Sequence, residues 1–175
     1  MCAFSFLNEV RMKTVARAIT DDLWPAILTL QREVYHAIEP EPLEVMRGKW
    51  LASPEYCLVH RDSEGVGAYL LAHTWHSLQP PRLHAPLPIS PRGKLLFVHD
   101  LAISPRLAGR GVGRALVGQV LQRAAGDEKQ AALLVAIQES QAFWEKFGFQ
   151  ALAYAPDASY GPGACAMLLE PLSQT

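Results

Sequence analysis

Glycine occurs at every second position in the stretch Gly109-Arg110-Gly111-Val112-Gly113, between two strongly patterned segments. Residues 95–103 before it have the composition of a strand. Residues 112–126 after it repeat apolar side chains at helical spacing, and Gly126 is placed to end that helix. Residues 131–137 are apolar throughout, as in a strand covered on both faces. A strand, a helix and a strand in this order predict a right-handed crossover with parallel strands, and therefore an α/β fold.

The flanking segments add strands and helices to this unit. The patterning predicts strands at 14–19, 56–60, 67–75, 150–154 and 165–169, and helices at 20–34, 41–51 and 141–147. We expect the second and third strands to form an antiparallel hairpin, and the last two to form another antiparallel pair. Residues 78–94 carry five prolines and predict a long loop, which either covers a binding site or is a plain surface excursion.

Size and composition limit the class of protein. A chain of 175 residues can build one hydrophobic core, and we expect a single domain at residues 12–175 after an N-terminal extension at residues 1–11. The formal net charge of −1 argues against nucleic acid or an anionic membrane as a partner, and no run reaches the roughly 18 apolar residues of a membrane-spanning helix. The three cysteines are widely spaced, which predicts neither disulfides nor a metal site and favours a reduced, cytoplasmic setting.

The glycine-rich turn has the properties of an anion site. The start of a helix presents unpaired backbone N–H groups, and glycines let a phosphate approach them closely. Arg106, Arg110 and Arg114 add positive charge around the turn in a nearly neutral chain. The spacing G-x-G-x-G matches neither the G-x-G-x-x-G of a dinucleotide site nor a loop ending in Gly-Lys-Ser/Thr. The sequence therefore predicts another kind of phosphate-bearing ligand and disfavours a nicotinamide-dependent oxidoreductase.

Residues 101–116 resemble the coenzyme A-binding motif of the GNAT superfamily of N-acetyltransferases, in which Gln/Arg-x-x-Gly-x-Gly/Ala follows a strand of the form Leu-Ala-Val. Further along, Phe143-Trp144-Glu145-Lys146-Phe147-Gly148-Phe149 is similar to that family's Phe-Tyr-Glu-Lys-Leu-Gly-Phe signature. With a weaker match at residues 14–30, the resemblance covers most of the chain. It implies a single α/β domain with a central mixed, strongly twisted sheet of about six to seven strands and helices on both faces.

The resemblance implies acetyl-CoA as the co-substrate and no metal. The pyrophosphate is expected on the main-chain amides of the turn, and the pantetheine arm between splayed parallel strands, which here are residues 95–103 and 131–137. Ala108 stands where the family has Gln or Arg, so we expect Arg106 or Arg110 to supply the missing charge. The expected contact residues are Leu101, Ala102, Ile103, Ala108, Gly109, Arg110, Gly111, Val112, Gly113, Arg114, Phe143 and Trp144.

The resemblance also implies direct attack of an amine on the thioester in a ternary complex, which requires a base for the ammonium proton. His99-Asp100-Leu101-Ala102 is similar to the corresponding strand of arylalkylamine N-acetyltransferases, so His99 is the expected base. Asp100 is a secondary candidate that strand alternation places on the opposite face, unless a bulge intervenes. Trp144 replaces the family's tyrosine and cannot act as an acid, so Ser140, Tyr154 or solvent is expected to protonate the thiolate.

These features together predict transfer of an acetyl group from acetyl-CoA to a primary amine. The similarity around His99 and the aromatic, proline-rich surroundings favour a small-molecule amine, with a protein N-terminus or a lysine as the close alternative. A non-catalytic module that senses coenzyme A is the alternative from another class, and a homodimer is left open. We expect Trp24, Tyr35 and Trp75 to belong to the core, and His73 and His76 to face opposite sides of a strand rather than share a metal.

Overall fold

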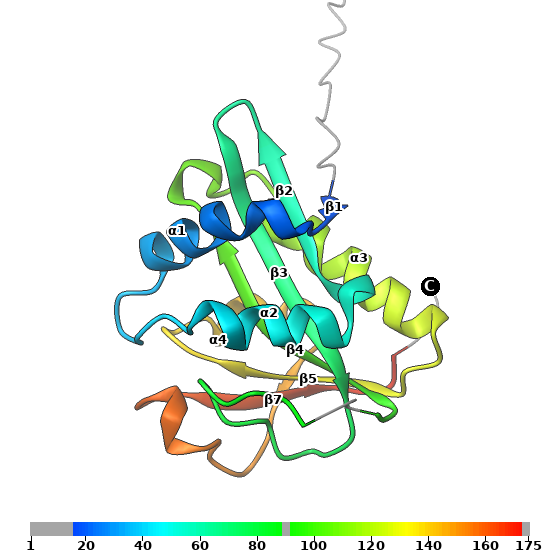
Figure 1. Cartoon of the computed structure of the whole chain (residues 1–175). Helices are drawn as coiled ribbons and strands as arrows, with labels where there is room; N and C mark the ends of the chain where they lie inside the picture. Colours follow the sequence, from blue (N-terminus) through cyan, green and yellow to red (C-terminus); the bar gives the residue numbers. More distant parts are fainter. Residues whose placement is uncertain (1–15, 89–91, 173–175) are drawn as a thin grey trace, which may run out of the picture.

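The computed structural model describes residues 16–88 and 92–172, which form one seven-stranded sheet in the order β1-β2-β3-β4-β5-β7-β6 (Figure 1). Neighbouring strands are antiparallel except for β4 and β5, so the sheet is mixed. The expected extension at residues 1–11 and the first two residues of the predicted strand 14–19 lie outside the described residues. The strands are β1 (Ala16–Ala18), β2 (Leu58–Asp62), β3 (Gly65–Trp75), β4 (Leu95–Ile103), β5 (Ala131–Ala136), β6 (Gln150–Ala151) and β7 (Cys165–Leu169).

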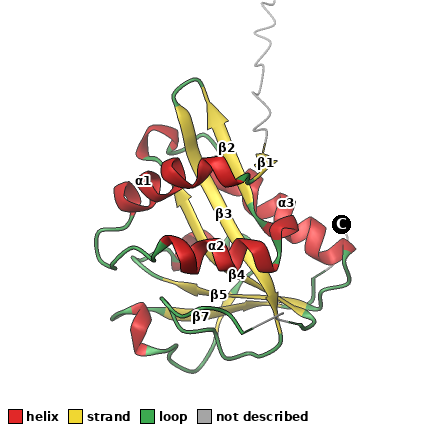
Figure 2. Cartoon of the chain, in the orientation of Figure 1, coloured by secondary structure: helices red, strands yellow, loops and turns green. Residues whose placement is uncertain are grey.

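Helices cover both faces of the sheet (Figure 2). On one face lie α1 (Trp24–Val34), which follows the short 3-10 helix η1 (Asp21–Leu23), and α2 (Leu43–Ala52). On the other face lies α3 (Val112–Gly126), and α4 (Gln141–Glu145) packs into the same core through Trp144. The expectation of one α/β domain with a mixed sheet and helices on both faces is confirmed.

Strand β3 separates the two cores because its side chains alternate between the two faces. Ala68 and Leu70 pack into the core under α3, together with Leu116. Tyr69 and Leu71 pack into the core under α1 and α2, together with Ile27. All four side chains of the strand are fully buried. Burial on both faces explains why residues 68–72 are all apolar or aromatic and do not alternate with polar residues.

Strands β4 and β5 run side by side for only half of the length of β4. Parallel pairing joins Leu95–Val98 to Ala131–Leu134. Within the described residues, the two strands do not pair beyond Val98. On its other side β4 stays paired with β3 up to Ile103. The separation therefore opens between β4 and β5, the two strands for which the resemblance to the GNAT superfamily implies it.

Several boundaries differ from the predictions. The helix expected at 41–51 begins only at Leu43, because Pro42 is extended and precedes the first turn. The strand expected at 150–154 is reduced to Gln150–Ala151: Leu152 still donates its N–H to the carbonyl of Ala166, and the chain then leaves the sheet. Three further 3-10 helices occur, η2 (Pro54–Tyr56), η3 (Pro105–Leu107) and η4 (Ala158–Tyr160).

The described part of the predicted loop 78–94 contains no helix, and its only regular structure before β4 is turns. Within residues 16–88 and 92–172, no helix combines the length and the apolar character that crossing a bilayer requires. In the same residues, no group of three His, Cys, Asp or Glu side chains is placed to hold a metal ion. Cys57 and Cys165 are free thiols, and burial raises the pKa of Cys57 to about 12.

Candidate active site

A cavity of about 280 Å³ occupies the space where β4 and β5 separate. One wall is the free part of β4, including His99, Asp100 and Ile103, and the opposite wall is the end of β5. The segment 38–41 between α1 and α2 closes another side, and Phe143 and Trp144 of α4 line the end near the glycine-rich turn. The cavity therefore extends from α4, which lies near the turn, toward the face of the sheet that carries α1 and α2.

The glycine-rich turn runs into α3, which begins at Val112. Gly109 and Gly111 have φ angles of +73° and +77°, in the left-handed region that side chains with a Cβ rarely adopt. Gly111 is the N-cap, and its carbonyl accepts the first intrahelical bond from Ala115. The amides at the start of the helix therefore have no acceptor within it, which is the arrangement that binds phosphate.

The buried Gly113 brings α3 close to the cavity wall. A Cβ on this residue would lie 2.4 Å from Cδ1 of Ile103 and 3.4 Å from Cζ of Phe143, so a larger side chain would displace two residues of the cavity wall. The observed geometry fits a diphosphate at the turn and an attached chain that continues between β4 and β5. The side chain of Ala102 points to the core under α1, so any contact of this residue with a ligand is through its backbone.

The three arginines of the turn are not equivalent. The Arg106 guanidinium is bonded to the carboxylate of Asp62, and its Nε lies 3.9 Å from Glu64, so the β2–β3 hairpin already neutralises its charge. Arg110 and Arg114 are exposed, as is Ala108. Of the two arginines expected to compensate for Ala108, Arg110 is the one whose side chain is free to turn toward a phosphate.

A β-bulge in β4 places His99 and Asp100 on the same face of the sheet. Val98 pairs with Ala72 and Asp100 pairs with Leu71, so His99 is an extra residue. The ring of His99 contacts those of Phe97 and His73, and Asp100 accepts a hydrogen bond from Tyr69, whose ring lies on the side of α1 and α2. The expectation from simple alternation, with Asp100 on the opposite face, is wrong because of this bulge.

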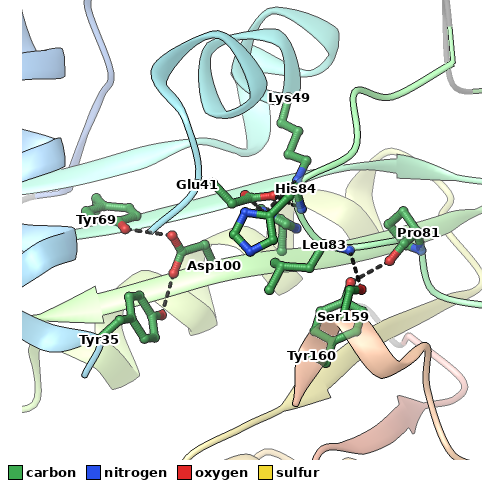
Figure 3. A network of polar contacts seen from close by, with 11 residues as sticks. Tyr35, Glu41, Lys49, Tyr69, Pro81, Leu83, His84, Asp100, Ser159 and Tyr160 are labelled. Carbon is green, nitrogen blue, oxygen red and sulfur yellow. Dashed lines mark hydrogen bonds and ion pairs between the residues drawn. The ribbon is translucent and has the colours of Figure 1, made fainter. Parts of the chain in front are cut away.

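Asp100 is held by two tyrosines from different elements (Figure 3). The hydroxyl of Tyr69 donates to Oδ2 at 2.6 Å, and the hydroxyl of Tyr35, directly after α1, donates to Oδ1. The Tyr35 hydroxyl also lies 3.0 Å from the carbonyl oxygen of Leu101. Burial raises the pKa of Asp100, and burial together with the nearby Asp100 raises the pKa of both tyrosines well above the ordinary value.

His99 belongs to a second polar cluster with Glu41 and Lys49. Oε2 of Glu41 lies 2.5 Å from Nε2 of His99, and Oε1 accepts a hydrogen bond of 2.5 Å from Nζ of Lys49. The side chains of all three residues are at most 4% exposed. Burial opposes ionisation of Glu41, but His99 and Lys49 outweigh it and lower its pKa. Burial lowers the pKa of Lys49, against the opposing effect of Glu41.

Hydrogen bonds hold the proline-rich loop at several points beside the cavity, near Glu41 and Tyr160. The backbone N–H of His84 donates to Oε1 of Glu41 at 2.7 Å, and that of Leu83 donates to Oγ of Ser159 at 3.0 Å (Figure 3). The hydroxyl of Tyr160 donates to the carbonyl of Pro81 at 2.6 Å. Because Leu83 lines the cavity, this part of the loop belongs to the cavity wall.

Comparison with known proteins agrees with this geometry. Residues 24–149 match the model of the acetyltransferase (GNAT) family. The chain belongs to the GNAT family. A search of curated proteins finds no match.

Solved structures show the same fold at low sequence identity. The loading GNATL domain of CurA from Lyngbya majuscula is 11% identical, with a TM-score of 0.73 over 90% of this chain and 97% of that chain. The ribosomal-protein-S18-alanine N-acetyltransferase from Escherichia coli is 15% identical, with a TM-score of 0.65 over 92% and 95%. Naa20 from Chaetomium thermophilum, solved with a bisubstrate analogue, is 18% identical, with a TM-score of 0.65 over 91% and 88%.

The two side chains expected as proton donors to the thiolate, Ser140 and Tyr154, lie in different places relative to the cavity. Ser140 lines the cavity next to Phe143 and Trp144. Tyr154 is half-buried and does not line the cavity, and its hydroxyl donates a hydrogen bond to the carbonyl of Leu78. Trp144 is 7% exposed and packs against Phe149, so the indole that replaces the family's tyrosine is a wall of the cavity and part of the core at once.

Several residues of this GNAT site could not be found from the sequence pattern. Tyr35, which we expected in the core, lines the cavity and binds Asp100. The pattern predicts Glu41 and Lys49 only as parts of a short helix, and no local spacing relates either of them to His99. The proline-rich composition of the loop was the one signal that pointed toward this end of the site.

Proposed function

We propose that this chain is an N-acetyltransferase that moves the acetyl group of acetyl-CoA to a primary amine in a ternary complex. The observation that carries the proposal is a cavity lined by His99 and Asp100, whose wall residues Ile103 and Phe143 contact the start of α3 at Gly113. The backbone amides from Gly111 to Arg114 would hold the pyrophosphate. The free edge of β4 beyond Val98 would take the pantetheine arm as an added strand.

In the proposed reaction, His99 accepts a proton from the substrate ammonium, directly or through a water, and the N–H electron pair stays on the amine. That pair then forms a bond to the thioester carbon. A backbone N–H near residues 101–103 stabilises the resulting oxyanion. The C–S bond breaks, its electron pair leaves with sulfur, and the second amine proton reaches the thiolate, with Ser140 or solvent as the donor. The products are an N-acetyl amine, coenzyme A and one released proton.

The shape of the acceptor side supports a small-molecule amine. Ile38, Leu83 and Tyr160 close around it from three segments of the chain, and the loop 81–84 is fixed by hydrogen bonds to two of these segments. A protein N-terminus would require this loop to open, and it remains the rival acceptor because protein acetyltransferases share the fold.

A module that binds coenzyme A without catalysis is the candidate from another class. The observation in its favour is Trp144, since the indole occupies the position of the family's tyrosine and lines the cavity without offering an acid. This candidate shares the coenzyme site with the proposed enzyme and differs only in turnover.

The test begins with acetyl-CoA binding, measured by calorimetry and by the shift in melting temperature. Release of thiol is then followed with arylalkylamines, polyamines and short peptides that have free N-termini. Binding with turnover of a small amine supports the proposal. Binding with turnover of peptides alone supports the protein acceptor, and binding without turnover of any amine supports the sensing module. Absence of acetyl-CoA binding would overturn all three.

A further inference from the structure

The contacts of His99 determine which of its ring nitrogens carries a proton. Nε2 has two polar neighbours, Oε2 of Glu41 at 2.5 Å and Nζ of Lys49 at 2.9 Å. A carboxylate only accepts hydrogen bonds and an ammonium only donates them, so Nε2 cannot satisfy both neighbours at once. The protonation of Glu41 therefore decides between the two tautomers.

Glu41 is ionised in this setting. His99 and Lys49 hold its pKa below the ordinary value despite burial. Oε1 already has two donors, because it accepts hydrogen bonds from Nζ of Lys49 and from the backbone N–H of His84. Among the described residues, the partner of Oε2 is His99. Nε2 of His99 must therefore be the donor, and Lys49 directs its hydrogen bond to Glu41 and not to the ring.

We infer that Glu41 is a positioning residue that holds His99 as the Nε2–H tautomer and so makes Nδ1 the atom that accepts the substrate proton. This inference rests on the function proposed above. Nδ1 is buried and has no hydrogen-bond partner within the described residues, so its lone pair is free. When Nδ1 takes the proton, the ring becomes an imidazolium whose Nε2–H already donates to a carboxylate, which stabilises the new charge.

The surroundings of His99 are consistent with this assignment. The ionisable groups that face it are Glu41, Lys49 of α2, His73 of β3 and Asp100 of β4. His73 is neutral, because burial lowers its pKa to about 3, and its Nδ1 is bonded to the carbonyl of Thr74. Asp100 is occupied by Tyr35 and Tyr69. Glu41 is therefore the carboxylate in contact with the ring.

If this assignment is right, the substitution Glu41→Gln should change the tautomer of His99. Lys49 and the backbone N–H of His84 both donate to Oε1 of Glu41, so in the variant the amide oxygen should occupy the position of Oε1. The amide nitrogen, a donor, then faces Nε2 of His99. Nε2 must give up its proton, and the ring changes to the Nδ1–H tautomer, which has no free lone pair at Nδ1. A wrong histidine tautomer of this kind severely reduces catalysis in hydrolases.

The experiment combines nitrogen NMR with kinetics. Long-range ¹H–¹⁵N spectra of the wild-type chain, with His99 assigned by the His99→Gln variant, should show the Nε2–H pattern, and Glu41→Gln should show the Nδ1–H pattern. With the best amine found, Glu41→Gln should lower kcat by about 10²-fold, while KM for acetyl-CoA changes less than twofold. Glu44→Gln is the matched control, because Glu44 is an exposed carboxylate on α2.

The outcomes separate this inference from the function itself. An Nδ1–H pattern in the wild-type spectrum overturns the inference even if the enzyme is active, and this measurement does not depend on the variant folding. A Glu41→Gln chain that melts near the wild-type temperature and keeps its kcat also overturns it. An Nε2–H pattern in a chain that binds acetyl-CoA but acetylates no amine would leave the tautomer assignment intact and remove the proposed function.

Discussion

The two ends of the candidate site are built by different means. At the coenzyme end, the groups that would bind the ligand are the main-chain amides of residues 111–114, and glycine conformation makes them accessible. At the acceptor end, the polar groups are side chains from the residue after α1, the segment before α2, α2 itself, β3 and β4. The first end is local in sequence, and the second is assembled by tertiary packing over separations of up to 65 residues.

The two ends should therefore respond differently to substitution. A site made of backbone amides tolerates most side-chain changes. It is sensitive to substitution of a glycine that adopts a left-handed φ. A buried network of charged and polar side chains is sensitive to every member, because removal of one partner leaves another buried group unsatisfied. Coenzyme affinity and turnover should therefore respond to different substitutions.

The largest effect is expected for His99→Ala. We expect kcat to fall by about 10²-fold or more, and most strongly at low pH, because the amine must then lose its proton to solvent. The affinity for acetyl-CoA should change less than twofold, since His99 lies away from the turn. Steady-state rates from pH 6 to 9, with calorimetry for acetyl-CoA, test both statements. A variant whose pH–rate profile keeps the wild-type height and shape would remove His99 from the proton path.

The opposite pattern is expected for Gly111→Val. A β-branched residue is strongly disfavoured at φ +77°, and its side chain would stand at the approach to the amides of α3. We expect the Kd for acetyl-CoA to rise roughly 10- to 100-fold, while kcat at saturating acetyl-CoA stays within about threefold. Gly118→Ala is the control, because Gly118 is exposed within α3 and nothing lies within 4 Å of the position that a Cβ would take there. Equal loss of affinity in both variants would contradict a specific role of the turn.

The contrast between a local site and one assembled by tertiary packing explains which features could be predicted from the sequence. The glycine turn and the crossover follow from patterns within residues 95–137, so they could be predicted, and the separation of the two strands was implied by the resemblance to the GNAT superfamily. The partners of His99 could not, since Glu41 and Lys49 meet it only after α2 packs on the sheet. The side on which Asp100 lies was mispredicted because a bulge depends on pairing with β3, where Leu71 and Ala72 oppose three residues of β4.

Within the acceptor end, Glu41 and Asp100 should affect stability with opposite dependence on pH. The folded chain lowers the pKa of Glu41, so the stability that this carboxylate adds is present above the ordinary pKa of about 4.3 and is lost as the pH falls through the lowered value. The folded chain raises the pKa of Asp100 through burial, so its ionisation costs stability as the pH rises from about 3.9 toward the raised value.

Urea unfolding from about pH 4 to 6 measures this contrast. As the pH rises, the free energy of unfolding of the wild type relative to Glu41→Gln should increase. Relative to Asp100→Asn it should decrease, with each change on the order of 1 kcal/mol. Glu44→Gln should follow the wild type at every pH. Parallel slopes for the two buried carboxylates would show that they share one environment and would break the distinction between the two clusters.

The smallest effect concerns the arginines of the turn. Arg106 is engaged by Asp62 and lies near Glu64, whereas Arg110 is exposed beside Ala108. We expect Arg110→Gln to raise the Kd for acetyl-CoA about twofold to fivefold at low salt, the size typical of exposed charge pairs, and this difference should shrink as salt is added. Arg106→Gln should leave the Kd within twofold. Calorimetry at two salt concentrations distinguishes the variants. If Arg106→Gln weakens binding more than Arg110→Gln, the ion pair with Asp62 must break when the coenzyme binds, and the coenzyme end would then depend on a side-chain rearrangement as well as on its backbone.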